Sequence, residues 1–320
     1  MMKIISFSSN FEKKISMHEN ILEVKNVTKN YSNHCALDNV SLSVPNGIIY
    51  GLLGPNGAGK TSLIRIVNQI TGPDAGTILF NGEKLSEKNI YEIGYLPEER
   101  GLYKKMKVGE QLLYLARLKG LNKSEALDKL RYWFEKFEIK TWWDKNVEDL
   151  SKGMQQKIQF VATVLHQPKL IILDEPFSGF DPINASIIKD EILELKEKGS
   201  TIIFSTHRME SVEELCDYIA LINKSKKVLE GKKQDIKDKY KSNTFSLQFN
   251  GELNGEFKTF SIISEITHLD GEKFAVLKAV DNSKSNQILK ELLPKIEIKS
   301  FKEDEASMND VFINAVQSSN

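Results

Sequence analysis

The spacing of hydrophobic positions changes several times along the chain, and each spacing predicts one kind of secondary structure. Apolar and polar residues alternate over residues 21–24 and 40–44, which is typical of strands with one buried face. Unbroken apolar runs predict strands buried on both faces, and they occupy residues 48–53, 170–173 and 201–204. Two more short strands are expected over residues 77–80 and 92–96.

Between these strands the apolar residues recur at helical spacing. Helices are therefore predicted over residues 61–70, 108–137, 155–165 and 184–196, with a break in the second at Gly120-Leu121-Asn122. Strands that alternate with helices imply a largely parallel sheet covered by helices, so the expected fold class is α/β.

A lysine-rich stretch over residues 226–241 marks a boundary in the chain. We interpret it as a solvated linker and helix, and contact with anionic lipid headgroups is the alternative. Beyond it, strands are predicted over residues 245–249, 274–280 and 296–301, and helices over residues 286–293 and 308–316. Residues 230–320 are therefore expected to form a small, separate α+β domain.

The composition argues against two classes of protein. The chain has 320 residues, enough for about two domains. Its 44 lysines and arginines balance its 44 aspartates and glutamates. Because a protein that grips the nucleic-acid backbone usually carries a large positive excess, no nucleic-acid partner is expected. The apolar runs are far shorter than the roughly 18 residues that a membrane span needs.

The cysteines and the N-terminus indicate the compartment. Cys35 and Cys216 are far apart and have no CxxC neighbours, so we expect neither a disulfide framework nor a zinc site, and a cytoplasmic location. Residues 1–20 are predicted to be a disordered extension without a signal peptide. Its true start is open between Met1, Met2 and Met17.

One glycine-rich segment matches the phosphate-binding pattern GxxxxGK[ST], and it reads Gly54-Pro55-Asn56-Gly57-Ala58-Gly59-Lys60-Thr61. It directly follows a buried strand and directly precedes a helix. Glycines let successive N–H groups turn toward phosphate oxygens, and the helix N-terminus adds partial positive charge. Lys60 is expected to reach the β- and γ-phosphates, and the Thr61 hydroxyl to bind Mg²⁺, with Ser62 beside it in the same site.

Two adjacent carboxylates follow the apolar run over residues 170–173. Asp174, at the end of this strand, is suited to hold Mg²⁺ through water, and Glu175 to orient and polarise an attacking water. Seen alone, such a pair could be a solvated strand end. The phosphate-binding loop favours the catalytic interpretation.

A third segment reads Leu150-Ser151-Lys152-Gly153-Met154-Gln155-Gln156-Lys157. With it, residues 21–229 resemble the ATP-binding subunits of ABC transporters, whose signature segment is usually LSGGQ. Ser151 can cap the helix that begins here and, with Gly153, offer N–H groups to an anion. The resemblance implies that this anion is the γ-phosphate of ATP held by a second copy, so that two head-to-tail copies enclose two ATP molecules.

The resemblance implies roles for four more residues. His207 resembles the switch histidine that contacts the γ-phosphate, and Asp181 lies in a segment similar to the D-loop, which communicates between the two sites. Tyr31 is placed like the aromatic residue that stacks on adenine. Glu98 stands where a glutamine is usual, and its carboxylate can still bind Mg²⁺ or its water.

Three further positions depart from the usual family pattern. Lys152 and Met154 replace a glycine and the glutamine of the signature, and Phe180 stands where leucine is usual. The segments LSKGM and YLPEERGLY are similar to those of the drug- and sodium-exporter-like branch of bacterial ABC ATPases. That branch often carries a small C-terminal domain and pairs with a separately encoded permease. The permease would dock on residues 97–121, within a helical subdomain expected over about residues 97–165.

The resemblance thus implies a P-loop NTPase of ABC type, an ATPase with ATP and Mg²⁺ as cofactors. As a homodimer on the cytoplasmic face of the cell membrane, it would power export through the permease. Two alternatives stay open at this point. One is a soluble ABC-type ATPase that acts on nucleic acid or ribosomes. The other is an ATP sensor with low turnover, motivated by Glu98 and Met154.

Overall fold

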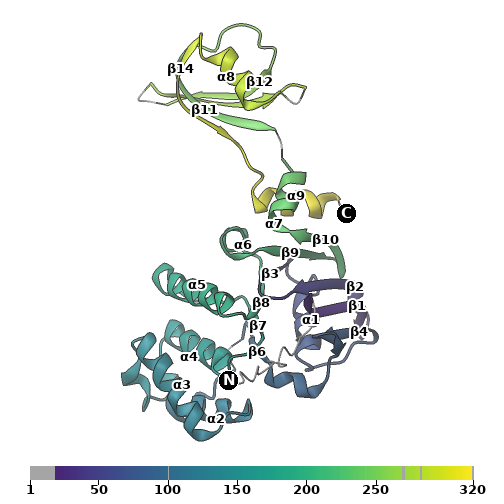
Figure 1. The fold of residues 1–320 in the computed structure, drawn as a ribbon, viewed down its shortest axis with the longest axis vertical. Helices are drawn as coiled ribbons and strands as arrows, with labels where there is room; N and C mark the ends of the chain where they lie inside the picture. Colours follow the sequence, from purple (N-terminus) through teal and green to yellow (C-terminus); the bar gives the residue numbers. More distant parts are fainter. Residues whose placement is uncertain (1–18, 100, 242, 269–270, 282, 319–320) are drawn as a thin grey trace, which may run out of the picture.

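The computed structural model describes residues 19–99, 101–241, 243–268, 271–281 and 283–318 (Figure 1). The predicted N-terminal extension lies outside the described residues up to position 18. None of the helices within the described ranges is long and apolar enough to cross a membrane.

A six-stranded sheet forms the centre of the larger part of the molecule (Figure 1). Its strand order is β10 (Lys226–Lys232), β9 (Tyr218–Asn223), β3 (Ile49–Leu53), β8 (Thr201–Thr206), β7 (Leu170–Asp174) and β6 (Ile93–Leu96). The five strands from β9 to β6 are parallel, and β10 pairs with β9 in antiparallel fashion. The predicted mainly parallel α/β sheet is confirmed.

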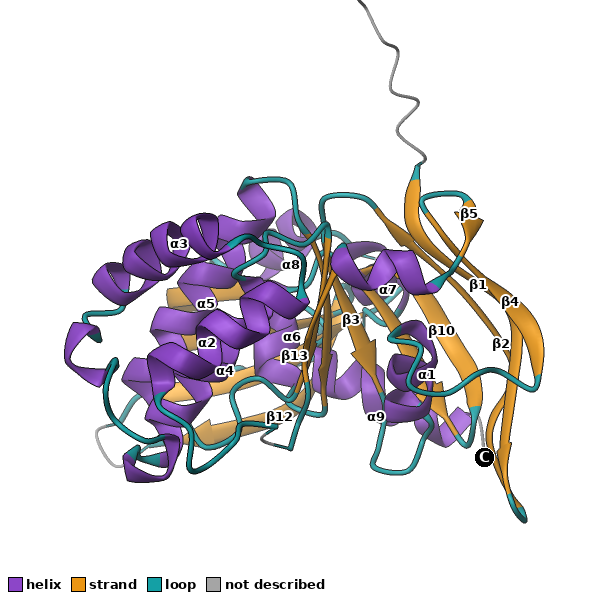
Figure 2. Cartoon of the chain, turned by 90° about the horizontal axis from the view of Figure 1, so that it is seen from below, coloured by secondary structure: helices purple, strands orange, loops and turns teal. Residues whose placement is uncertain are grey.

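A second sheet is antiparallel and covers one face of the first (Figure 2). Its strand order is β2 (His34–Pro45), β1 (Asn20–Tyr31), β4 (Ala75–Phe80) and β5 (Glu83–Lys84). Helix α1 (Lys60–Val67) lies between the two sheets, where its Leu63 and Ile64 share one buried core with Val24 of β1 and Tyr50 of β3. This core holds the start of α1 against the ends of the parallel strands.

Helices cover the other face of the parallel sheet. In chain order they are η1 (Glu87–Tyr91), α2 (Val108–Leu118), α3 (Lys123–Lys136), η2 (Lys140–Trp142), η3 (Val147–Asp149), α4 (Lys152–Val164), α5 (Pro182–Glu197) and α6 (Met209–Leu215). The predicted break between α2 and α3 is confirmed. The Asn122 side chain caps α3 by accepting a 3.0 Å hydrogen bond from the Glu125 N–H. The Glu125 carboxylate in turn accepts a hydrogen bond from the Asn122 N–H.

The C-terminal part has an antiparallel sheet and a core of its own. The strand order is β12 (Phe260–Thr267), β13 (Lys273–Ala279), β11 (Thr244–Gly251) and β14 (Ile296–Glu303), and α8 (Ser285–Leu292) packs on one face. The sequence analysis predicts no strand at β12. There the apolar–polar alternation is interrupted by a bulge between Ile262 and Ser264, and seven of its eight residues are exposed.

Two segments near the domain boundary differ from their prediction. Residues 226–232 are not a linker, because they form β10 at the edge of the parallel sheet. Helix α7 (Lys233–Lys239) then leads toward the C-terminal sheet. The last helix, α9 (Met308–Ser318), packs into the large core of the first part through Met308, Val311 and Ala315. The chain therefore leaves the C-terminal sheet and returns to the part that contains the parallel sheet.

The separate C-terminal core predicts a localised response to substitution. Leu277 is fully buried there, so Leu277→Ala should lower the free energy of unfolding of this sheet by about 2–5 kcal/mol. Ile266 lies on the same sheet with 59% of its surface exposed, and Ile266→Ala should cost less than about 0.5 kcal/mol. Denaturant-dependent amide exchange of residues 244–303 measures both. Equal losses in the two variants would contradict this assignment of the core.

Candidate nucleotide-binding site

The phosphate-binding loop joins β3 to α1 and depends on two close backbone approaches. A Cβ atom on Gly54 would lie 2.2 Å from the Ile222 carbonyl oxygen, and one on Gly59 would lie 2.3 Å from the Ala36 carbonyl oxygen. The φ angles of these two glycines are 150° and 116°, which L-residues rarely adopt. Only glycine therefore fits at both ends of the loop, and its backbone stays close to β2 and β9.

The ammonium group of Lys60 is buried inside this loop. Its Nζ donates hydrogen bonds to the carbonyl oxygens of Gly54 at 2.7 Å and Pro55 at 3.2 Å. Burial lowers the pKa of Lys60, and the carboxylates of Glu175 and Asp174 act in the opposite direction. A phosphate group beside Lys60 would supply a negative charge that stabilises this poorly solvated ammonium group.

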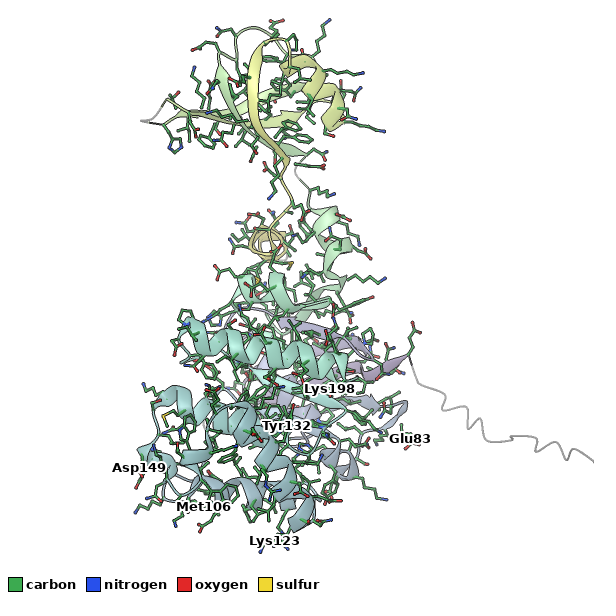
Figure 3. All side chains as sticks on the ribbon, turned by 60° about the vertical axis from the view of Figure 1, so that its left-hand side comes forward. Glu83, Met106, Lys123, Tyr132, Asp149 and Lys198 are labelled. Carbon is green, nitrogen blue, oxygen red and sulfur yellow. The ribbon has the colours of Figure 1, made fainter. Side chains whose placement is uncertain are left out.

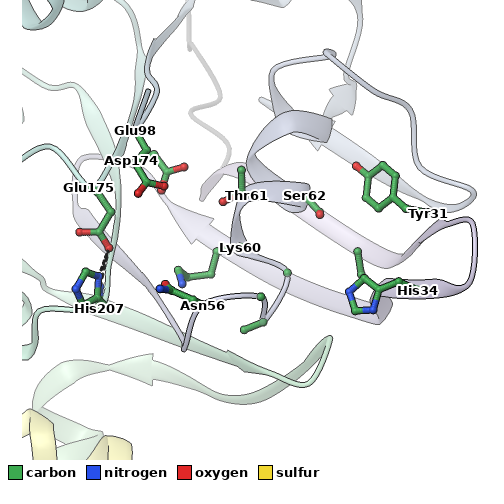
Figure 4. A pocket seen from close by; sticks show the side chains of 14 residues that line it. Tyr31, His34, Asn56, Lys60, Thr61, Ser62, Glu98, Asp174, Glu175 and His207 are labelled. Atoms are coloured by element: carbon green, nitrogen blue, oxygen red, sulfur yellow. Dashed lines mark hydrogen bonds and ion pairs between the residues drawn. The ribbon is translucent and has the colours of Figure 1, made fainter. Parts of the chain in front are cut away.

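Acidic side chains line the pocket at the ends of the strands (Figure 4). Asp174 ends β7, and its buried Oδ2 has no hydrogen-bond partner in the described part of the chain. Burial raises the pKa of Asp174, and the neighbouring carboxylates of Glu98 and Glu175 raise it further. A bound cation would relieve both the desolvation and the repulsion between these carboxylates.

These carboxylates do not form a complete metal cage. Among the described residues, no group of three or more His, Cys, Asp or Glu side chains is placed to hold a metal ion. Mg²⁺ commonly binds through one or two protein groups, substrate phosphates and water. The hydroxyl of Thr61 and the free oxygen of Asp174 line the same pocket and fit that mode of binding.

Glu175 is held in one orientation by the end of β8. Its Oε1 lies 2.6 Å from Nδ1 of His207 and accepts the His207 N–H at 2.9 Å, while Oε2 accepts the Thr206 hydroxyl at 3.1 Å. The backbone of Glu175 has a φ of 47°, a left-handed conformation that costs about 1–3 kcal/mol in a residue other than glycine. The hydrogen bonds to β8 stabilise this conformation at the rim of the pocket.

The opposite end of the pocket is formed by the turn between β1 and β2. Tyr31, His34 and Ala36 lie there, and the whole pocket has a volume of about 350 Å³ (Figure 4). Asn56, Gly57, Ala58, Gly59 and Ser62 line it between the two ends. The sequence analysis missed His34. The short turn between β1 and β2 could have indicated His34. Tyr31 pairs with His34 across this turn, so both side chains can reach the same pocket.

Five predicted site residues do not line this pocket. Gly54 and Pro55 stand at the start of the loop, where their carbonyl oxygens accept hydrogen bonds from Lys60. The other three lie at or near the N-termini of α4 and α5. Ser151 is exposed and caps α4 by accepting a 3.3 Å hydrogen bond from the Met154 N–H. Asp181 is exposed and caps α5, where the Asn184 N–H lowers its pKa. Gly153, in the first turn of α4, lies close to the segment that precedes α5. A Cβ atom on it would lie 3.8 Å from the Phe180 ring.

The strand, glycine loop and helix, with a buried lysine facing strand-end carboxylates, define a P-loop nucleoside-triphosphatase. The ABC transporter family profile matches residues 37–178, and the profile described as "ATP-binding protein DrrA1-3-like, C-terminal domain" matches residues 231–316. The ABC transporter ATP-binding protein YhaQ of Bacillus subtilis is 42% identical over 296 residues, which are 92% of this chain and 98% of YhaQ. The chain belongs to the ATP-binding proteins of ABC transporters.

Two further relatives carry names that refer to export or resistance. The Nod factor export ATP-binding protein I of Cupriavidus metallidurans is 32% identical, over 79% of this chain and 84% of that protein. The linearmycin resistance ATP-binding protein LnrL of Bacillus subtilis is 33% identical, over 68% of this chain and 70% of that protein.

Solved structures agree with the family. An ATP-binding subunit of an ABC transporter has a TM-score of 0.65 and 30% identity, over 69% of this chain and 93% of that one. This chain is therefore an ATP-binding ATPase subunit of an ABC transporter, and the predicted ABC-type fold is confirmed.

The loop geometry predicts different tolerances at two glycines. Gly59→Ala should weaken ATP binding by about tenfold or more, because its Cβ meets the Ala36 carbonyl and the loop must move away. Gly57→Ala is the matched control. Its φ is 78°, yet no atom lies within 4 Å of the added Cβ, so its affinity for ATP should change much less. Calorimetric titration with ATP measures both, and an equal loss would contradict the steric argument.

Proposed function

We propose that this chain hydrolyses ATP to drive export through a separately encoded permease, and that it works as a head-to-tail homodimer on the cytoplasmic face of the cell membrane. The observation that carries the export assignment is the match of residues 231–316 to the DrrA1-3-like C-terminal domain, because the exporter-like branch that the sequence resembles often has a small domain there. The names of relatives described as Nod factor export and linearmycin resistance proteins also support it.

Mg²⁺ would be held by Thr61 and, directly or through water, by Asp174 and Glu98. It would neutralise charge on the β- and γ-phosphates. Lys60 exchanges its hydrogen bonds to the loop carbonyls for bonds to these phosphates. Tyr31 stacks on the adenine at the other end of the pocket, beside His34.

Glu175 orients the attacking water and accepts its proton. The hydrogen bonds from Thr206 and His207 support this role, because they fix the carboxylate at the pocket rim before nucleotide binds. The ring of His207 bonds to Glu175 and would turn toward the γ-phosphate when the site closes. This rearrangement links nucleotide binding to the position of the catalytic carboxylate.

The second copy would complete the site. Ser151, Gly153 and Asp181 lie outside their own pocket, and Ser151 and Asp181 are exposed at the N-termini of α4 and α5. Helix N-termini favour anions, and the exposed Lys152 adds a positive charge at the first turn of α4. These groups suit the γ-phosphate held by the partner's loop, although Lys152 and Met154 replace the usual signature residues.

Replacing the proposed base should separate binding from hydrolysis. Glu175→Gln is expected to lower kcat by about 10²–10⁴-fold while ATP still binds, because the amide cannot accept the proton from water. Asp190→Asn, at an exposed position on α5, is the control and should keep full turnover. Steady-state phosphate release measures both. Unchanged release by the Glu175 variant would remove it from this role, and no release by the unmodified protein would favour the sensor alternative.

A group of exposed apolar side chains supports the docking of a permease on residues 97–121. Tyr103 and Tyr114 are 57% and 44% exposed, and their ring centroids lie 6.4 Å apart in an edge-to-face arrangement. Leu118, one turn farther along α2, is 56% exposed. Exposed aromatic clusters of this kind are typical of protein-binding surfaces.

Removing this aromatic pair should weaken the complex without affecting the pocket. The double substitution of Tyr103 and Tyr114 by alanine is expected to reduce co-purification with the permease by about tenfold or more, while basal ATP hydrolysis is kept. Tyr132→Ala is the matched control, because Tyr132 is 48% exposed on α3 (Figure 3). Co-expression with the neighbouring permease gene and quantification from membranes measures this. Equal losses for both surfaces would contradict the docking site.

A further inference from the structure

One carboxylate on α6 binds both segments that connect the C-terminal sheet to the ATP-binding part. Oε2 of Glu213 accepts a 2.9 Å hydrogen bond from the Met308 N–H at the start of α9. Its Oε1 forms an ion pair with Lys237 of α7. Figure 1 shows α7 and α9 lying between the parallel sheet and the C-terminal sheet.

The ion pair is well shielded from water on the lysine side. The side chain of Lys237 is 9% exposed, and it also bonds to Glu305, in the segment before α9, at 3.3 Å. Burial acts to raise the pKa of Glu213, but Lys237 and the Met308 N–H outweigh it and hold the pKa below its ordinary value. Removing Glu213 would leave a buried ammonium group with only the exposed Glu305 as a partner, so this junction is sensitive to substitution.

Apolar packing strengthens the same junction. Met209, Val212 and Leu215 of α6 are buried in one core with Met308 and Val311 of α9. The two helices are therefore joined by both a charged contact and a hydrophobic contact. A shift of α9 would carry α6 with it, because packed helices move as units.

Helix α6 also connects directly to the catalytic end of the pocket. It begins at Met209, two residues after His207, whose ring lies 2.6 Å from Glu175. The seven-residue helix is about 10 Å long, so Glu213, its fifth residue, is separated from the His207 segment by little more than one helical turn. The helix that follows His207 is thus also the helix that bonds to α7 through Glu213.

We propose that Glu213 is a positioning residue for His207, through which the C-terminal domain controls the rate of ATP hydrolysis. This inference rests on the proposed catalytic roles of His207 and Glu175. When α7 and α9 are clamped to α6, the backbone of His207 stays where its ring can bond to Glu175 and can turn toward the γ-phosphate. When the clamp is broken, α6 shifts, and the site still binds ATP but hydrolyses it more slowly.

A neighbouring ion pair on the same helix provides a matched control. Glu214 pairs with Lys189 of α5 and is more exposed than Glu213. Within the described residues it forms no ion pair or side-chain hydrogen bond with α7 or α9. Glu214→Gln therefore removes a carboxylate one position away without opening the junction. The test compares it with Glu213→Ala, with Lys237→Met and with the charge swap that combines Glu213→Lys and Lys237→Glu.

The experiment measures kcat and KM for ATP hydrolysis, together with amide exchange of residues 205–215 in the presence and absence of ATP, on the full-length protein. Glu213→Ala and Lys237→Met should each lower kcat by about threefold to thirtyfold with little change in KM. The charge swap restores one ion pair, but the lysine at position 213 cannot accept the Met308 N–H, so it should recover only part of the loss. Glu214→Gln should behave like the unmodified protein. Amide exchange at the start of α6 should rise in the two single variants.

Combining Glu213→Ala with His207→Ala shows whether Glu213 positions His207 or only stabilises the fold. If Glu213 acts through His207, then adding Glu213→Ala to the His207→Ala variant should lower kcat no further. Fully additive losses, or an unchanged kcat in both Glu213→Ala and Lys237→Met, would overturn the proposal. A fall in thermal stability without a change in kcat would show that Glu213 only braces the fold, which also overturns it.

Failure of the proposed function has a different signature. It fails if His207→Ala and Glu175→Gln both leave kcat unchanged, whatever the Glu213 variants do. If the unmodified protein binds ATP without hydrolysing it, amide exchange alone tests the coupling between α6 and the C-terminal domain. ATP should then alter exchange in residues 205–215 and 305–316 together, and Glu213→Ala should confine the change to the first segment. A change confined to the first segment in the unmodified protein would refute the coupling.

Discussion

The buried ammonium group of Lys60 is the interaction on which the rest of the site depends. A lysine that loses water must be compensated by nearby oxygen atoms, and here these are two loop carbonyls and the carboxylates at the strand ends. Burial raises the pKa of Asp174, and repulsion from the carboxylates of Glu98 and Glu175 raises it further. The pocket thus places one poorly solvated ammonium group opposite three neighbouring carboxylates. A triphosphate with its metal ion would give each of them a partner.

The architecture follows from keeping this arrangement in place. Parallel strands end at the same edge of a sheet, so β3, β7 and β8 deliver Lys60, Asp174 and the His207 segment to one place. The antiparallel sheet and α1 provide a separate core behind the loop, and the turn between β1 and β2 closes the far end of the pocket. Few of these contacts involve the C-terminal sheet, which has its own core.

The return of the chain through α9 gives the C-terminal sheet a second attachment to the part that contains the parallel sheet. A C-terminal sheet attached by a single linker could move freely, whereas here the chain is anchored on its way out by α7 and on its way back by α9. Both anchors meet α6, the helix that directly follows His207. None of the described residues of the C-terminal sheet lines the pocket, yet one short helix connects its two anchors to the His207–Glu175 pair.

Local sequence alone determined the phosphate loop, the buried strands and the carboxylates that follow them, because glycine spacing, apolar runs and helix caps depend on near neighbours. It also placed Ser151 at a helix start, where its side chain caps α4. Tertiary structure decided what depends on distant partners. These include β12, whose bulge hides its alternation, the pocket position of His34, and the edge strand within the lysine-rich stretch. The packing of α9 on α6 belongs to the same group, because residues about 95 positions apart meet only once the chain has folded.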